Sequence, residues 1–252
     1  MSGPIPRVRM FAGPNGSGKS TLKSVLPQEL LGVYLNPDEI EHTIRQQRFV
    51  DLETYGISLT TEEVLPFFTQ SRLLQEAGQT EAVQRLTFGA GRLDFAGVEV
   101  DSYLASVVVD LLREKLLERK VTFTFETVMS HPSKVALLEK AQGLGYRTYL
   151  YYIATDDPEI NISRVRSRVK LGGHDVPEDR ITSRYHRSLA LLMEAIRHTN
   201  RAYIFDNSTS EQDRTWLAEV TEGRELEMKA DRIPAWFKRA VLDKITCGTS
   251  QP

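Results

Sequence analysis

The sequence has very little cysteine: Cys247 stands alone among 252 residues, so no disulfide can form within the chain. It also lacks any apolar run near the roughly 20 residues that a membrane-spanning helix needs. Residues 1–6 contain no apolar core of a signal peptide. These absences exclude a disulfide-rich secreted domain and a membrane-spanning protein, and they favour a reducing, cytoplasmic compartment with no membrane partner.

Excess charge of either sign is missing as well. The formal net charge is −2, which gives no general attraction to nucleic acid or to an anionic membrane. We therefore expect no extended nucleic-acid binding. A hydrophobic fraction of 40% and a charged fraction of 26% are ordinary for a globular domain.

A phosphate-binding motif stands near the start of the chain. Residues 13–20, GPNGSGKS, fit the pattern G-x-x-x-x-G-K-[ST] at every fixed position. A short apolar run precedes the motif and residues 21–26 can open a helix, so the loop sits where a strand turns into a helix. This context disfavours the alternative of a glycine-rich turn that matches by chance. In such a loop Lys19 reaches the β- and γ-phosphates and the Ser20 hydroxyl holds Mg²⁺. We therefore predict that ATP and Mg²⁺ bind at nine consecutive residues: Gly13, Pro14, Asn15, Gly16, Ser17, Gly18, Lys19, Ser20 and Thr21.

The order of strands and helices predicts an α/β fold. Five short strands alternate with helices, which is typical of a parallel sheet covered by helices on both faces. We place these strands at residues 8–12, 33–35, 121–125, 146–153 and 202–205. We expect residues 1–210 to form the domain, with a helical insertion at about 51–102. Residues 211–252 are predicted to add a hairpin and a short helix packed on the same domain.

Acidic residues follow two of the strands, at the edge where parallel sheets bind their ligands. Asp38 is a candidate base that orients an acceptor hydroxyl; the alternative is a helix-start acid that only complements the helix dipole. Asn36 already suits the capping position, which leaves Asp38 available. Glu126, followed by Thr127, is a candidate for holding Mg²⁺ through water or for binding the acceptor, and the alternative is a solvated strand end.

Basic residues gather between positions 164 and 187. Residues four apart share a helix face, and a Gly172-Gly173-His174-Asp175 turn separates the two predicted helices. We interpret this segment as a lid that closes guanidinium groups over a transferring phosphate; the alternative is two solvated helices. Arg168 and Arg184 rank first for contact with phosphate, followed by Arg164. His174 either contacts substrate or is merely exposed. The seven basic residues are Arg164, Arg166, Arg168, Lys170, Arg180, Arg184 and Arg187.

Four segments together resemble the zeta-toxin-type kinases: residues 13–21, Asn36-Pro37-Asp38-Glu39-Ile40, Phe125-Glu126-Thr127 and residues 164–189. The resemblance covers residues 7–50 and 103–208. It implies a P-loop kinase fold whose five-stranded parallel sheet has the order 2-3-1-4-5. It also implies that ATP and Mg²⁺ are used to phosphorylate the 3′-hydroxyl of the amino sugar in UDP-N-acetylglucosamine, and that a small protein antitoxin holds the kinase inactive.

Carried over residue by residue, the resemblance places the catalytic aspartate at Asp38 and a substrate-binding glutamate at Glu126. It places the phosphate-loop lysine at Lys19 and the phosphate-clamping arginines at Arg168 and Arg184. One departure concerns the arginine that follows the glutamate in the family and contacts the sugar nucleotide. Residues 127–131, TVMSH, contain no arginine.

Two alternatives therefore stay open beside a kinase of UDP-N-acetylglucosamine. One is a P-loop kinase of another hydroxyl acceptor, such as a nucleoside, a nucleotide or a nucleic-acid end. The segment 51–102, which has no counterpart in the resemblance, is a candidate for forming a different acceptor pocket. The other alternative is a non-catalytic ATP-binding partner protein. The presence of Asp38 and Glu126 together with the arginines argues against it, because a mere binder needs no acceptor base.

Overall fold

The computed structural model of the protein describes residues 4–173, 175–209 and 214–248. The chain divides into two compact units. Met1–Leu31 and Thr124–Pro252 form the first unit, and Gly32–Phe123, one continuous stretch between them, forms the second.

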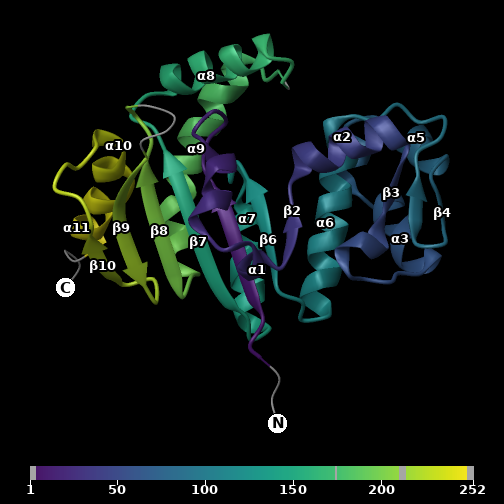
Figure 1. The fold of residues 1–252 in the computed structure, drawn as a ribbon, viewed down its shortest axis with the longest axis horizontal. Helices are drawn as coiled ribbons and strands as arrows, with labels where there is room; N and C mark the ends of the chain where they lie inside the picture. Colours follow the sequence, from purple (N-terminus) through teal and green to yellow (C-terminus); the bar gives the residue numbers. More distant parts are fainter. Residues whose placement is uncertain (1–3, 174, 210–213, 249–252) are drawn as a thin grey trace. The chain divides into compact units, whose positions relative to one another are not determined.

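The first unit is built on a mostly parallel sheet, in which neighbouring strands follow the order β10-β9-β8-β7-β1-β6 (Figure 1). β1 pairs in parallel with β7, and β7 pairs in parallel with β8. The predicted parallel sheet is confirmed, and four of the five predicted strands lie in the implied order 3-1-4-5. The strands are β1 (Arg7–Ala12), β6 (Phe123–Thr127), β7 (Arg147–Ala154), β8 (Arg201–Asp206), β9 (Thr215–Thr221) and β10 (Glu225–Met228).

The sheet extends beyond the predicted fifth strand. β9 runs antiparallel to β8, and β10 runs antiparallel to β9. The hairpin predicted after residue 211 is thus confirmed, but the prediction of a five-stranded, wholly parallel sheet is corrected. The reason is that a hairpin added in sequence to an exposed edge satisfies the edge's backbone N–H and C=O groups without a crossover helix.

Successive residues of β7 point to opposite faces of the sheet, and each face is covered. The Tyr152 hydroxyl lies 3.0 Å from Ser188 Oγ on α9 (Glu178–Arg197). The Ile153 side chain points the other way, toward Gly18 of the phosphate loop. Helix α7 (Pro132–Gly143) packs against both β7 and α9.

The element after the phosphate loop differs from the expected α-helix. Lys19–Val25 forms a 3₁₀ helix, η1, and the short helix α1 (Gln28–Leu31) follows it. Leu26 has extended backbone angles, φ −118° and ψ 142°. The residue before a proline is pushed out of the helical region, so Pro27 ends the element after seven residues.

Two helices that carry all seven residues of the basic cluster pack as a hairpin in the first unit. Helix α8 (Pro158–Lys170) begins with Asp157 as its cap, since the carboxylate accepts the Glu159 N–H at 2.9 Å. Ile162 and Val165 of α8 form a small buried core with Val176 and Ile181. Figure 1 shows α8 at the end of the sheet where β7 and β8 terminate.

The C-terminal segment is joined to the ends of β7 and β8 by a single tryptophan. Trp236 is fully buried; its indole N–H donates to Asp206 Oδ1 at 2.7 Å, and its backbone N–H donates to Asp156 Oδ1 at 3.1 Å. The predicted short helix of this segment is confirmed as a series of three turns. They are α10 (Ala235–Phe237), the π-helical η3 (Lys238–Leu242) and α11 (Asp243–Gly248).

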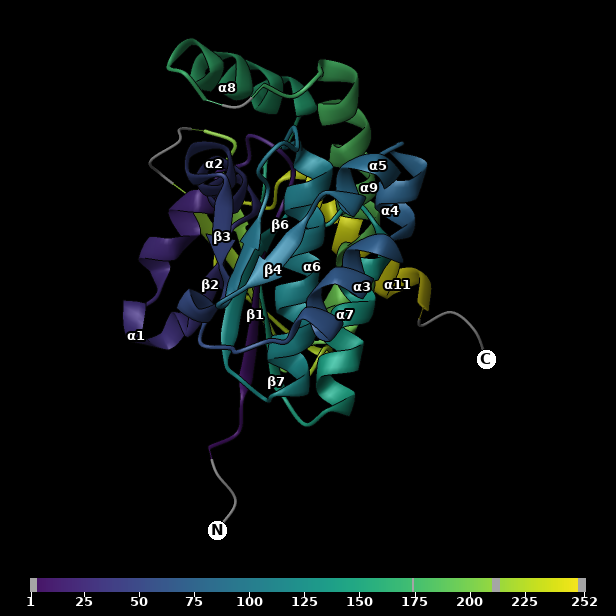
Figure 2. The same ribbon diagram turned by 90° about the vertical axis from the view of Figure 1, so that its right-hand side faces the viewer.

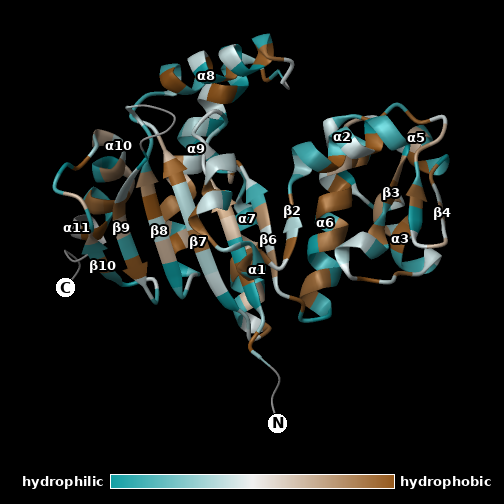
Figure 3. Ribbon diagram, viewed as in Figure 1, coloured by the Kyte–Doolittle hydropathy of each residue, from teal (hydrophilic) through white to brown (hydrophobic). Residues whose placement is uncertain are grey.

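The second unit combines helices with a small sheet of its own. The strands β3, β5 and β4 pair antiparallel in that order, while apolar residues gather on α6 (Figure 3). Figure 2 shows the same unit from the side. Its elements are β2 (Val33–Leu35), α2 (Pro37–Gln47), β3 (Phe49–Asp51), η2 (Leu52–Tyr55), α3 (Thr61–Thr69), α4 (Arg72–Glu76), α5 (Thr80–Gln84), β4 (Thr87–Gly89), β5 (Arg92–Asp94) and α6 (Ser102–Glu118).

The helical insertion expected at residues 51–102 is therefore corrected. It contains the β4–β5 hairpin, whose turn residues Ala90 and Gly91 have φ values of 49° and 76°. Two consecutive positive φ angles are typical of the tight turns that join antiparallel strands. Strands of three residues are too short for an alternating pattern to stand out in the sequence. Within the described residues, no helix has both the length and the apolar character needed to cross a bilayer.

Candidate active site

Three glycines give the phosphate loop its shape. Gly13, Gly16 and Gly18 have φ values of 149°, 74° and 98°, which side-chain-bearing residues rarely adopt. None of them has space for a Cβ atom either. It would lie 2.0 Å from the Ile153 carbonyl oxygen at Gly13, 2.5 Å from the Asn161 carbonyl oxygen at Gly16 and 2.5 Å from Asn207 Nδ2 at Gly18. The loop is thus pressed closely against β7, α8 and the residue after β8.

Gly13→Ala should lower the free energy of unfolding by at least about 3 kcal/mol, because the clash with the β7 backbone adds to the backbone strain. Gly145→Ala is the matched control: Gly145 has a φ of 84°, but nothing lies within 4 Å of a Cβ placed there. Strain alone should cost that variant about 1–2 kcal/mol. Urea denaturation measures both values, and equal losses would show that the loop has room for the methyl group.

The Lys19 ammonium lies inside the loop. Its Nζ donates to the carbonyl oxygens of Gly13 and Pro14, both at 2.9 Å. The Ser20 hydroxyl, two residues from the end of the glycine series, is exposed, whereas the Thr21 hydroxyl donates back to the Gly18 carbonyl at 2.7 Å. The cation is therefore held where the motif predicts phosphate oxygens, and Ser20 is accessible to a ligand.

Two buried asparagines support the loop from behind. Asn207 follows β8, and its Nδ2 donates to the Ser17 carbonyl at 2.9 Å. Asn161 on α8 donates from Nδ2 to the Asn15 carbonyl at 2.5 Å. Both are fully buried. Asn207 directly follows a strand, at the edge where parallel sheets bind their ligands, so its position is a signal in the sequence; Asn161 was not predicted. The only signal for Asn161 is an uncharged polar residue in the first turn of α8.

Some buried polar atoms at the loop have no partner among the described residues. The Ser17 hydroxyl and Asn207 Oδ1 both belong to fully buried residues, and Asn15 Oδ1 is a third such atom. Polar atoms buried without a partner cost free energy, and such atoms often mark sites that a ligand or water completes. The Ser17 hydroxyl can donate to an oxygen of a ligand such as a polyphosphate, whereas the two amide oxygens are acceptors and need a donor such as water.

The Glu126 carboxylate lies at the end of β6, beside β1, the strand that leads into the loop. Glu126 is only 7% exposed. The next residue, Thr127, accepts the Met129 N–H at its hydroxyl oxygen, at 3.0 Å, and Met129 has a φ of 54°. The chain therefore turns sharply after the strand, and the carboxylate stays partly enclosed.

The side chains of the basic cluster differ in their contacts and in their exposure. Arg166 forms an ion pair with Glu178 at 2.5 Å, and Arg187 donates to the Ser183 carbonyl of its own helix. Arg164 and Arg184 are half-buried. Arg168 is exposed, with its Cγ packed so closely on Gly173 that a Cβ there would lie 2.6 Å away. The hairpin of α8 and α9 thus brings the three top-ranked arginines onto one structural piece.

His174 of the predicted turn lies outside the described residues. The adjoining Asp175 is exposed.

Asp38 belongs to the second unit, in the first turn of α2. Asn36 is the helix cap, because its Oδ1 accepts the backbone N–H groups of Asp38 at 2.9 Å and Glu39 at 3.4 Å. The predicted cap is confirmed. The Asp38 side chain is exposed. Its carboxylate is therefore not required for capping the helix.

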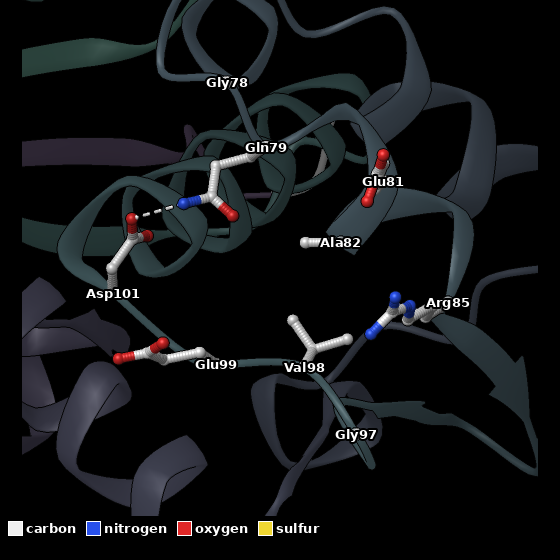
Figure 4. Close-up of a pocket in the computed structure, with 9 residues that line it drawn as sticks. All are labelled: Gly78, Gln79, Glu81, Ala82, Arg85, Gly97, Val98, Glu99 and Asp101. Atoms are coloured by element: carbon white, nitrogen blue, oxygen red, sulfur yellow. Dashed lines mark hydrogen bonds between the residues drawn. The ribbon is translucent and has the colours of Figure 1, made fainter.

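The second unit also holds a separate cavity of about 480 Å³ (Figure 4). Arg85 and Asp101 face it from opposite sides. Both Asp101 oxygens are engaged: Oδ1 caps α6 and Oδ2 accepts from Gln79 Nε2 at 2.9 Å. Arg48 fixes the rim, since its guanidinium donates to the carbonyls of Phe95 and Val98 at 2.9 and 2.5 Å. Asp101 thus has a structural role at this cavity.

A known family matches the C-terminal part of the site. The family model described as zeta toxin matches residues 98–216, which contain Glu126, both arginine helices and Asn207. Outside that match, the phosphate loop supplies its own evidence from the structure. Residues 98–216 are therefore similar to the zeta-toxin family.

The chain is similar to an uncharacterized protein of Haemophilus influenzae, with 25% identity over 177 residues that cover 69% of this chain and 89% of the relative. Its fold is similar to that of the PezAT chromosomal toxin–antitoxin system of Streptococcus pneumoniae, with a TM-score of 0.50 and 16% identity, covering 100% of this chain and 90% of the other.

Crystal structures of the AvrRxo1-ORF1:ORF2 complex share the fold as well. The structure with sulphate ions has a TM-score of 0.53 and 16% identity over 90% of this chain, and the structure with ATP has a TM-score of 0.51 and 15% identity over 97%. The present chain spans only 62% and 64% of the length of those chains. At these identities the likeness supports the kinase fold alone.

Proposed function

We propose that this protein transfers the γ-phosphate of ATP to a hydroxyl group of a small acceptor, best represented by the 3′-hydroxyl of UDP-N-acetylglucosamine. The observation that carries the proposal is the phosphate loop. Its glycines leave no room for side chains, its lysine points inward, and the buried Ser17 hydroxyl lacks a partner among the described residues. Such a cradle suits a polyphosphate.

The residues of the loop would hold ATP as the motif predicts, from Gly13 to Thr21. The exposed Ser20 hydroxyl and the enclosed Glu126 carboxylate are the proposed Mg²⁺ ligands, the second through water. In sites of this kind Mg²⁺ is held by one or two carboxylates together with the phosphates of the nucleotide. When bound, Mg²⁺ neutralises charge on the phosphates.

Each of the remaining residues has its own proposed role in phosphoryl transfer. Lys19 would shift from the Gly13 and Pro14 carbonyls to the phosphate oxygens. Arg168, Arg184 and Arg164 would stabilise the charge that develops on the transferring phosphoryl group. Asp38 would accept the acceptor's hydroxyl proton and orient that oxygen in line for attack, while Glu126 and Thr127 bind the acceptor. His174 is a further proposed substrate contact.

The acceptor has a second candidate class. No arginine follows Glu126 within residues 127–131, and the second unit has a polar cavity of its own. These observations favour keeping other hydroxyl acceptors, such as a nucleoside, a nucleotide or a nucleic-acid end, in the same experiment. A protein antitoxin is a proposed partner and the cytoplasm the proposed location. The likeness to PezAT, a toxin–antitoxin system, supports the partner.

Incubation with ATP, Mg²⁺ and each candidate acceptor, followed by mass measurement of the products, tests the proposal. UDP-N-acetylglucosamine should gain one phosphoryl group. Phosphorylation of only another acceptor would overturn the sugar-nucleotide assignment and keep the kinase. Phosphorylation of no acceptor class, with ATP bound, would favour a binding protein.

Lys19→Ala tests the nucleotide site separately. ATP with Mg²⁺ should raise the melting temperature of the unaltered protein, because a ligand that binds only the folded state stabilises it. The variant should lose most of that shift, since the ammonium no longer neutralises the phosphates. Lys23→Ala, an altered lysine of the same 3₁₀ helix outside the motif, is the control. Equal shifts in all three proteins would contradict a phosphate-loop site.

A further inference from the structure

A buried asparagine joins the phosphate loop to the first arginine helix. Asn161 is fully buried in the first turn of α8, where an uncharged polar side chain needs partners. Its Nδ2 donates to the Asn15 carbonyl at 2.5 Å, and its Oδ1 accepts from the Thr155 hydroxyl. The Asn161 backbone also lies against Gly16 so closely that a Cβ there would be 2.5 Å from its carbonyl oxygen. Loop and helix are therefore in direct contact at two points.

Thr155 extends this connection to the second arginine helix. It is fully buried directly after β7, and its backbone carbonyl accepts the Tyr185 hydroxyl of α9 at 2.7 Å. Burial raises the pKa of Tyr185, so this phenol keeps its proton and remains a donor. The polar chain Asn15–Asn161–Thr155–Tyr185 thus links the loop, the end of β7, α8 and α9.

The spacing of residues along α8 places the buried asparagine on the same face as two of the arginines. Residues at i, i+3 and i+7 share one face of a helix, so Asn161, Arg164 and Arg168 point to the same side of α8. On α9, Arg184 directly precedes Tyr185. The face of α8 that is bonded to the loop is therefore the face that carries two of the three candidate arginines.

We infer that Asn161 is a positioning residue. Together with Thr155 it fixes the positions of both arginine helices relative to the phosphate loop. The inference rests on the proposed phosphoryl transfer. Asn161 would act through the arginines, without contact with the reacting atoms. A displacement of a charge-stabilising group by about 1 Å can lower the rate by on the order of 10²-fold. The loss of one buried amide would therefore lower kcat.

Asn161→Ala should lower kcat by on the order of 10²-fold, with a much smaller change in KM for ATP. Asn200→Ala is the matched control. Asn200 also supports a strand by a side-chain bond, from Thr148 N–H to its Oδ1 at 2.9 Å, but near the start of β7 and away from the loop. It should lose stability without a comparable loss in kcat. Thr155→Val removes only the hydroxyl donor and provides a second variant should Asn161→Ala not fold.

A double-mutant cycle distinguishes positioning from a general structural role. In an Arg168→Ala background, Asn161→Ala should have a much smaller effect on kcat than in the unaltered protein, because its route through the arginine is already lost. Fully additive losses in kcat, or equal kcat losses in Asn161→Ala and Asn200→Ala, would overturn the inference. If Lys19→Ala and Arg168→Ala themselves left turnover intact, the proposed function would fail instead, so the two failures are distinguishable.

Discussion

Asp38→Asn is expected to reduce phosphorylation of the true acceptor by roughly 10²–10⁴-fold, the range that general-base catalysis supplies. The asparagine side chain keeps the size of the carboxylate but cannot accept the hydroxyl proton. Binding of ATP with Mg²⁺ should remain, because the nucleotide site is assigned to the phosphate loop. Folding should remain too, because Asn36 caps α2 without help from the Asp38 side chain.

Glu39→Gln is the matched control for Asp38→Asn. Both acids are exposed in the first turn of α2, so each should contribute about 0.3–1 kcal/mol through the helix dipole. Turnover, ATP affinity and melting temperature are measured on one preparation of each variant. Full activity of Asp38→Asn, with a lowered melting temperature like that of Glu39→Gln, would reduce Asp38 to a helix-start acid.

Arg168→Ala and Arg184→Ala should each lower kcat by on the order of 10²-fold or more, as expected for groups that stabilise a transferring phosphoryl group. ATP affinity should change much less, because the guanidinium charge acts most strongly on the charge that develops in the transition state. The side chains lie on different helices of one hairpin, so a closing lid would bring both to the phosphate. Steady-state kinetics at saturating acceptor measure kcat, and calorimetry measures ATP affinity.

Arg166→Ala is the control for the arginine variants. Arg166 lies on α8 between Arg164 and Arg168, but its guanidinium is committed to Glu178 at the surface. Exposed ion pairs contribute little to stability, about 0–1 kcal/mol, so this variant should keep its turnover. Unchanged turnover in all three variants would identify the cluster as two solvated helices.

The sequence alone was sufficient for the local features of the fold. The parallel strands, the loop motif and the Asn36 cap depend on a few neighbouring residues, and those residues carry strong conformational preferences. The β9–β10 hairpin was also predictable, because Glu222-Gly223 marks a turn between two strand-like segments. The three-stranded sheet of the second unit was not, since strands of three residues carry too little periodicity.

What escaped prediction depends on contacts between distant parts of the chain. The sequence shows that Gly13 belongs to a phosphate motif, but not that the β7 backbone passes close enough to exclude a methyl group. Asn161 looks like any polar residue of a basic helix until the fold buries it against Asn15. One exception is local: Pro27 keeps Leu26 out of the helical region, which ends the helix after the loop at seven residues.

The residues that support the phosphate loop are synthesised long after the loop itself. Its supports bind it from far along the chain: Asn161, Asn207 and Arg214 donate to carbonyls that lie 146, 190 and 193 positions earlier. A ribosome adds about 5–20 residues per second, so roughly 10–40 s pass between synthesis of the motif and synthesis of its last support. A nascent chain therefore contains the complete motif long before it has a formed nucleotide site. Competence to bind ATP should arise only after Arg214 has been synthesised, and products terminated before that residue should bind ATP poorly.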